Sequence, residues 1–130
     1  MIEFYLDAGS GVSPYQQVAQ QVRRALRLGM LREGDQLPTV KEVVAKLAIN
    51  PNTVLKAYRE LEHEGLVVAR PGLGTFVTRT LAAEAAVAAQ RPLRAELARW
   101  LAKARKAGLD DDAIEALFAT AIRDAARDAA

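Results

Sequence analysis

The segment from Leu37 to Leu66 constrains the fold of this chain more than any other, because it holds two short helical patterns separated by a tight turn. The first pattern opens with Thr39, and Glu42 follows at the spacing of a capping box. The second opens with Asn50-Pro51, an N-cap residue followed by proline at the first helical position, and Gly65 marks its end. Two short helices joined in this way predict a helix-turn-helix.

Another helix is predicted before this segment. Ser13 and Gln16 have the spacing of a second capping box, and Gly29 ends the helical pattern. Tyr15 belongs to its apolar stripe. The arginines on the far half of this helix form either a solvated face or contacts to DNA phosphates. These arginines are Arg23, Arg24 and Arg27.

After Gly65 the pattern changes from helical to extended. Leu66–Ala69 and Thr75–Thr78 are rich in β-prone residues, and the loop between them carries Gly72 and Gly74. A strand pair directly after a helix-turn-helix predicts a wing, whose tip reaches the phosphate backbone or the minor groove of DNA. The glycines alone indicate only turn geometry. A short extended segment is also expected at Glu3–Leu6.

The residues from Leu81 to Ala130 form an alanine-rich tail with two amphipathic patterns. Pro92 leaves open whether the region 81–107 is one helix or two. Asp110 is the N-cap expected for the last helix. A pair of helices cannot bury both apolar faces alone. These faces are therefore covered either by another part of the chain or by a second copy of it. The residues predicted for a dimer interface are Leu93, Leu97, Trp100, Leu101, Ile114, Leu117, Phe118 and Ile122.

The expected fold class is therefore mostly α (α+β). Residues 1–79 form a winged helix-turn-helix DNA-binding domain, and residues 80–130 form a helical dimerisation tail.

Composition excludes several classes of protein. The chain has no cysteine and a single histidine, so disulfides, zinc knuckles and multi-histidine metal sites are ruled out. No apolar run approaches the roughly 20 residues of a membrane span, and the first residues lack the pattern of a signal peptide. The formal net charge of +2 is too small to identify a partner, so the placement of the basic residues has to do so.

Several blocks of sequence resemble one family. They are PYQQVA from Pro14, GMLREGDQLPT from Gly29, NPNTV from Asn50, AYRELE from Ala57, EGL from Glu64 and GLGTFV from Gly72. Together, over about residues 13–78, they resemble the winged helix-turn-helix domain of GntR-type bacterial transcription regulators. The short tail and the NPNTV block resemble the YtrA subfamily, whose tail mediates homodimerisation and whose members often control genes for ABC-type transporters.

This resemblance implies a set of DNA-binding residues. Lys41 takes the position of a basic residue that reads a guanine, although Arg is more usual there. Pro51 and Leu55 stand where many members have Arg, so base reading is expected from Asn52, Thr53 and Lys56. The remaining expected residues are Tyr58 and Arg59, on phosphates or in the core, and Arg70, Gly72 and Gly74 at the wing.

The resemblance implies a repressor that binds a palindromic operator in double-stranded DNA as a homodimer, including the operator of its own operon. No cofactor, metal or membrane contact is expected, and the location expected is the bacterial cytoplasm, at the nucleoid. Whether a small-molecule effector exists is open. The alternatives are a winged helix that binds proteins instead of DNA and a small enzyme using His63. The polar residues of the second helix disfavour the first, and His63 has no evident nucleophile partner.

Overall fold

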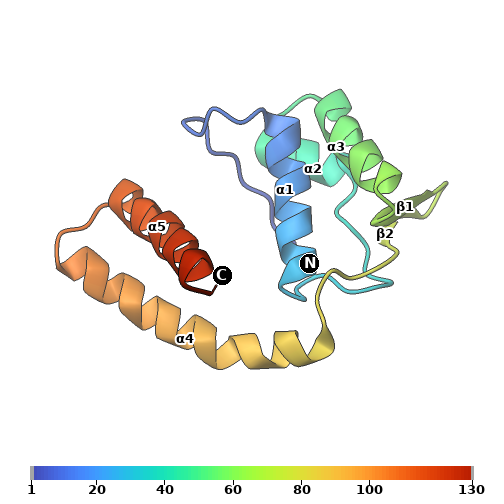
Figure 1. The fold of residues 1–130 in the computed structure, drawn as a ribbon. Coiled ribbons are helices and arrows are strands. Elements are labelled where there is room, and N and C mark those ends of the chain that lie inside the picture. Colours follow the sequence, from blue (N-terminus) through green and yellow to red (C-terminus); the bar gives the residue numbers. More distant parts are fainter. Residues whose placement is uncertain (1, 130) are drawn as a thin grey trace. The chain divides into compact units, whose positions relative to one another are not determined.

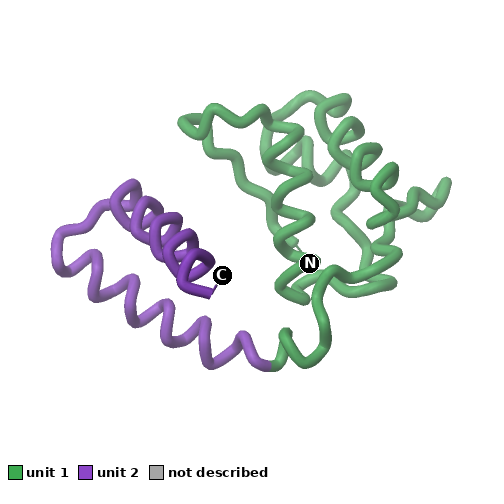
Figure 2. Tube along the Cα trace, in the orientation of Figure 1, with its two compact units in different colours: residues 1–88 green, residues 89–130 purple. Residues whose placement is uncertain are grey.

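The structure, a computed structural model, describes residues 2–129 and consists there of helices and one small sheet (Figure 1). The fold class is the predicted one, mostly helical with a two-stranded wing. The chain forms two compact units that divide between Ala88 and Ala89 (Figure 2). The elements are α1 (Pro14–Arg27), α2 (Val40–Leu47), α3 (Pro51–His63), β1 (Val67–Arg70), β2 (Gly74–Val77), α4 (Glu84–Lys106) and α5 (Asp111–Ala129).

The first unit is built around the packing of α1 against α3. Val18, Val22 and Leu26 of α1 are completely buried, as are Val54 and Leu61 of α3. These residues recur at helical spacing, so each helix turns one apolar face inward. The core therefore fixes the orientation of α3, the second helix of the helix-turn-helix.

An ion-pair network joins the same two helices at their outer edge. The Arg23 guanidinium donates to both carboxylate oxygens of Glu64, at 2.7 and 3.1 Å, and to Glu60 at 3.1 Å. The hydrogen bonds that the Arg23 guanidinium donates to the Glu64 carboxylate are the main reason that the pKa of Arg23 is raised. Arg23 is thus partly exposed but engaged in ion pairs, and it ties α1 to the end of α3.

Two of the three predicted cap structures in the first unit are confirmed. Glu42 N donates to Thr39 Oγ1 at 3.1 Å and the Glu42 carboxylate accepts from the Thr39 backbone, which completes the capping box. Asn50 Oδ1 accepts from Asn52 N at 2.8 Å. The predicted box at Ser13 is wrong, because the Ser13 hydroxyl donates to the Gln16 side chain at 3.0 Å and makes no cap bond.

The wing follows α3 directly. Strands β1 and β2 are antiparallel, with Val67 opposite Val77 and Arg70 opposite Gly74. Both strands lie one residue nearer the turn than predicted. Gly72 has a φ of +75°, a left-handed conformation that glycine adopts at no steric cost.

The segment before α1 is held by glutamine side chains instead of by a strand. Gln21 bonds both backbone polar groups of Tyr5, at 3.1 and 2.8 Å, and Gln17 bonds those of Asp7, at 2.7 and 3.0 Å. Both glutamines are buried, so their amides are satisfied by backbone in place of water. Phe4 is thereby placed in the core. Residues Glu3–Leu6, which were predicted to form an extended segment, do not form a strand.

The tail contains one long helix and one shorter one, which resolves the alternative left open at Pro92. Helix α4 runs through Pro92 without interruption. Because proline has no N–H to donate, the carbonyl of Ala88 lacks its helical partner at the point where the two compact units divide. Asp110 accepts from Ala113 N at 2.8 Å and caps α5 as predicted.

Residues 80–88 pack with the first unit. The Thr80 hydroxyl donates to the carbonyl of Leu26 at 3.3 Å, and Val87 lies so close to Gly29 that a Cβ there would meet it at 2.6 Å. The packing division therefore falls after the boundary predicted at 79/80. The functional division into residues 1–79 and 80–130 stays a prediction.

Candidate nucleic-acid interface

The outer face of α3 is polar and basic. Asn52, Lys56 and Arg59 are exposed and lie on one side of the helix, because residues three and four apart share a face. Thr53 is half-buried beside them. The opposite side of α3 is buried in the core, so these side chains are the ones that a partner of this helix would meet.

Lys41 is exposed near the start of α2. It lies between Thr39 and Glu42, the two members of the confirmed capping box, so its backbone is held in the first helical turn. Sequence reasoning placed Lys41 at one interface with Asn52, Thr53, Lys56 and Arg59, and the structure gives these side chains solvent access.

Tyr58 requires a correction to the predicted DNA-binding set. Its side chain is only 5% exposed, and its hydroxyl donates to the carbonyl of Pro38 at 2.6 Å. Burial, with a smaller effect from the Glu42 carboxylate, raises the pKa of Tyr58 well above its ordinary value. Tyr58 therefore fastens α3 to the turn that precedes α2, and its side chain has no free polar group to offer DNA.

The wing is anchored at β1 and at its turn. Ala69 N donates to the Glu62 carboxylate at 2.8 Å, and Gln36 Nε2 donates to the carbonyl of Leu73 at 3.2 Å. The Arg70 guanidinium lies 5.0 Å from the centre of the Phe76 ring, within the range of a cation–π contact. Sequence reasoning missed Gln36 and Glu62, whose partners are backbone groups that no local pattern identifies.

The positions of the wing glycines agree with a turn. Gly72 is exposed at the tip, and Gly74 is half-buried at the start of β2, where a Cβ would meet Gln36 Nε2 at 2.5 Å. Gly74 therefore allows the close approach of the side chain that supports the tip.

Another long-range contact involves the interface itself. Lys56 Nζ lies 4.0 Å from the centre of the Tyr15 ring, so the start of α1 reaches the exposed face of α3. No sequence signal relates these two positions.

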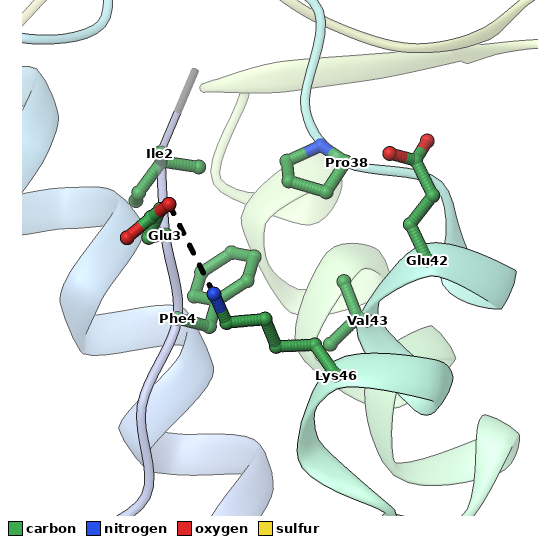
Figure 3. A pocket seen from close by; sticks show the side chains of 7 residues that line it. All are labelled: Ile2, Glu3, Phe4, Pro38, Glu42, Val43 and Lys46. Carbon is green, nitrogen blue, oxygen red and sulfur yellow. Dashed lines mark ion pairs between the residues drawn. The ribbon is translucent and has the colours of Figure 1, made fainter.

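A small pocket opens beside α2, between that helix and the segment before α1 (Figure 3). Ile2, Phe4 and Val43 supply apolar walls, and Glu3 and Lys46 form an ion pair of 3.9 Å at its rim. Its volume of about 190 Å³ is below the roughly 300–1,000 Å³ typical of ligand sites, so it is a poor candidate for an effector site.

Residues 2–129 lack two kinds of structural feature. Within them, no helix combines the length and apolar character that crossing a membrane requires. The same residues contain no group of three or more His, Cys, Asp or Glu side chains arranged to hold a metal ion.

A helix-turn-helix followed directly by a two-stranded wing, with a basic and polar outer face on its second helix, defines a winged helix-turn-helix DNA-binding protein. Comparisons with known proteins identify the family. Residues 14–77 match the family described as bacterial regulatory proteins, gntR family. The chain is 31% identical over 105 residues to the HTH-type transcriptional repressor YtrA of Bacillus subtilis, and the match covers 81% of each chain.

Solved structures agree with this identification. YtrA from Sulfolobus acidocaldarius, a GntR-family transcription factor, is 30% identical with a TM-score of 0.55, over 76% of this chain and 97% of that one. The N-terminal domain of AraR in complex with mutant ORR3 is 26% identical with a TM-score of 0.50, over 53% of this chain and 99% of that one. The chain belongs to the GntR family of transcription regulators, and its similarity is to the YtrA type.

Proposed function

We propose that this regulator is a repressor that binds a palindromic operator as a homodimer. The observation that carries the proposal is the exposed polar and basic face of α3, held rigid by the core and continued by the wing. The similar YtrA of Bacillus subtilis is named a transcriptional repressor, which supports the direction of control. A module for binding proteins would instead present large apolar side chains on this face.

In the proposed complex α3 enters the major groove. Asn52 is suited to bidentate pairing with adenine, and Thr53 to a hydrogen bond or a thymine methyl. Lys56 and Lys41 supply positive charge to guanine acceptors, although lysine lacks the fork of arginine and discriminates less sharply. Because Pro51 and Leu55 carry no charge, these four side chains carry the sequence preference.

The phosphate backbone is contacted on both sides of α3. Arg59 lies one helical turn beyond the base-reading residues and is assigned to a phosphate. Arg70 is placed at the wing, where a narrow minor groove attracts arginine, and Gly72 and Gly74 let the backbone of the wing approach the DNA.

The tail is assigned to dimerisation. Leu93, Leu97, Trp100 and Leu117 are large apolar side chains with exposures of 38 to 60%, and Ile122 is 71% exposed. A second copy of the tail would cover them. Leu101 and Phe118 are half-buried at the edge of this surface, and the Phe118 ring lies 5.1 Å from that of Trp100.

Ile114 was predicted at the dimer interface but is not part of the interface proposed here. It is only 4% exposed in a single chain, so it is already covered before any partner binds. The proposed interface therefore consists of the other seven predicted residues.

Two such chains would place their α3 helices in successive major grooves, with half-sites about 34 Å apart or a multiple of that distance. The proposed targets are the protein's own operon and transporter genes, with the cytoplasm and nucleoid as the place of action. Selection of bound fragments from genomic DNA, followed by footprinting, tests the proposal. Two symmetric protected half-sites are expected, whereas protection of a single asymmetric site would contradict a palindromic operator.

A further inference from the structure

A contact between α1 and α3 brings an aromatic ring to the proposed DNA-binding face. Lys56 Nζ lies 4.0 Å from the centre of the Tyr15 ring. A cation within about 6 Å of an aromatic ring centre is attracted by the negative face of the ring. The contact therefore restrains a side chain that otherwise samples many rotamers.

Packing and ion pairs hold the Tyr15 ring in place relative to α3. Tyr15 is half-buried and packs against the core, and the helix that carries it is tied to α3 by the ion pairs of Arg23 with Glu60 and Glu64. Lys56 is exposed one turn after Asn52 on α3. The distance between the ring and the lysine backbone is thus set by the packing of the two helices.

The charge of Lys56 remains available to an anion. In the described part of the chain, no carboxylate lies within ion-pair distance of Lys56, in contrast to Lys46 and Arg23. A cation–π contact uses only the side of the ammonium that faces the ring, so the N–H donors that point away from the ring can still bond a base or a phosphate.

We infer that Tyr15 is a positioning residue for DNA recognition, which holds the Lys56 ammonium at a fixed place on the face of α3. This inference rests on the proposed function and extends it to a residue of α1. Tyr15→Phe keeps the ring and is the matched control. Tyr15→Leu keeps an apolar side chain but removes the ring.

The first test needs no DNA and uses the full chain. A ring current moves the NMR signals of the Lys56 ε-methylene protons upfield. The shift should be present in the wild type and in Tyr15→Phe and should disappear in Tyr15→Leu. If the Lys56 signals do not move in Tyr15→Leu, the inference is overturned.

The second test is a double-mutant cycle on operator affinity, measured by fluorescence anisotropy. Tyr15→Leu should weaken binding about threefold, as expected of an exposed cation–π contact, and Tyr15→Phe should change it little. In a Lys56→Met background, Tyr15→Leu should have no further effect. Equal weakening in both backgrounds would overturn the inference while leaving the proposed function intact. Failure of the wild type to bind any operator would reject the proposed function instead, and the NMR test would still decide whether Tyr15 holds Lys56.

Discussion

The two compact units of this protein bury their apolar side chains to very different degrees. In the first unit, Leu26, Leu37 and Leu61 are each at most 1% exposed. In the second unit, Leu93 and Ile122 keep 60% and 71% of their surface in water. A large apolar side chain gains about 1.5–3 kcal/mol from full burial, so the three leucines have already gained this stabilisation and Leu93 and Ile122 have not. The difference supports the proposal that the first unit folds by itself and that association of two tails covers the exposed side chains.

Removal of the tail is expected to have the largest effect. A chain ending at Ala88 should keep the fold of the first unit but become monomeric. Operator affinity should fall on the order of 10²–10⁴-fold, because the second half-site is no longer bound by a linked copy. Analytical ultracentrifugation and an anisotropy titration measure the two effects. A truncated chain that remained a dimer would contradict the assignment of the interface.

Two alanine substitutions, one in each unit, test the comparison further. Leu61→Ala in the core should lower the free energy of unfolding by about 2–5 kcal/mol, since it leaves a cavity among buried side chains. Ile122→Ala should weaken dimerisation and leave the unfolding of the first unit unchanged. Urea denaturation at several protein concentrations separates the two outcomes. If the unfolding of the first unit were as sensitive to Ile122→Ala as to Leu61→Ala, the two units would not be independent.

Because of Tyr58, the free energy of unfolding of the first unit is expected to depend on pH in the alkaline range. Its pKa is raised in the folded state, so the neutral phenol is favoured by folding and its contribution is fully present below its ordinary pKa of about 10. Above that pH the free energy of unfolding should fall by up to about 1.4 kcal/mol per pH unit, because the unfolded chain loses the proton first. Tyr58→Phe should lack this component of the slope between about pH 10 and 11. Identical slopes for the two proteins would show that the phenol is not held neutral.

Lys56→Ala is expected to have the smallest effect of this series. Because Lys56 is assigned to a base, its loss should lower affinity mainly for the correct sequence. If Lys56 instead contacts a phosphate, affinity should fall for all sequences, and the slope of log affinity against log salt concentration should decrease by about one unit. Unchanged affinity in the titration would remove Lys56 from the interface.

Features that depend on residues close together in the sequence, such as helix caps, could be predicted from the sequence. The cap at Thr39 and the stop at Gly65 depend on residues within one helical turn, so their spacing in the sequence is enough to identify them. The box at Ser13 has the same spacing, yet its hydroxyl bonds the Gln16 side chain and accepts no cap bond, so spacing alone does not ensure a capping box. The predicted bounds of both strands lay one residue too far from the turn, because the strand pairing continues to Arg70 and Gly74.

Contacts between distant residues could not be predicted. Arg23 and Glu64 are 41 positions apart, and the backbone of Tyr5 is paired by a glutamine 16 positions away. Such contacts depend on how helices pack, which a single sequence pattern does not encode. The same reason explains why the sequence left Tyr58 either on a phosphate or in the core, and the structure places its hydroxyl in the core.

The most direct test of the account is the ratio of affinities for the selected operator and for a scrambled duplex of equal length, measured by anisotropy at one physiological salt concentration. If the face of α3 reads base sequence, the operator should bind at least about 10³-fold more tightly. Equal affinities for the two duplexes would mean that the basic face binds only the phosphate backbone, and they would contradict the proposed function.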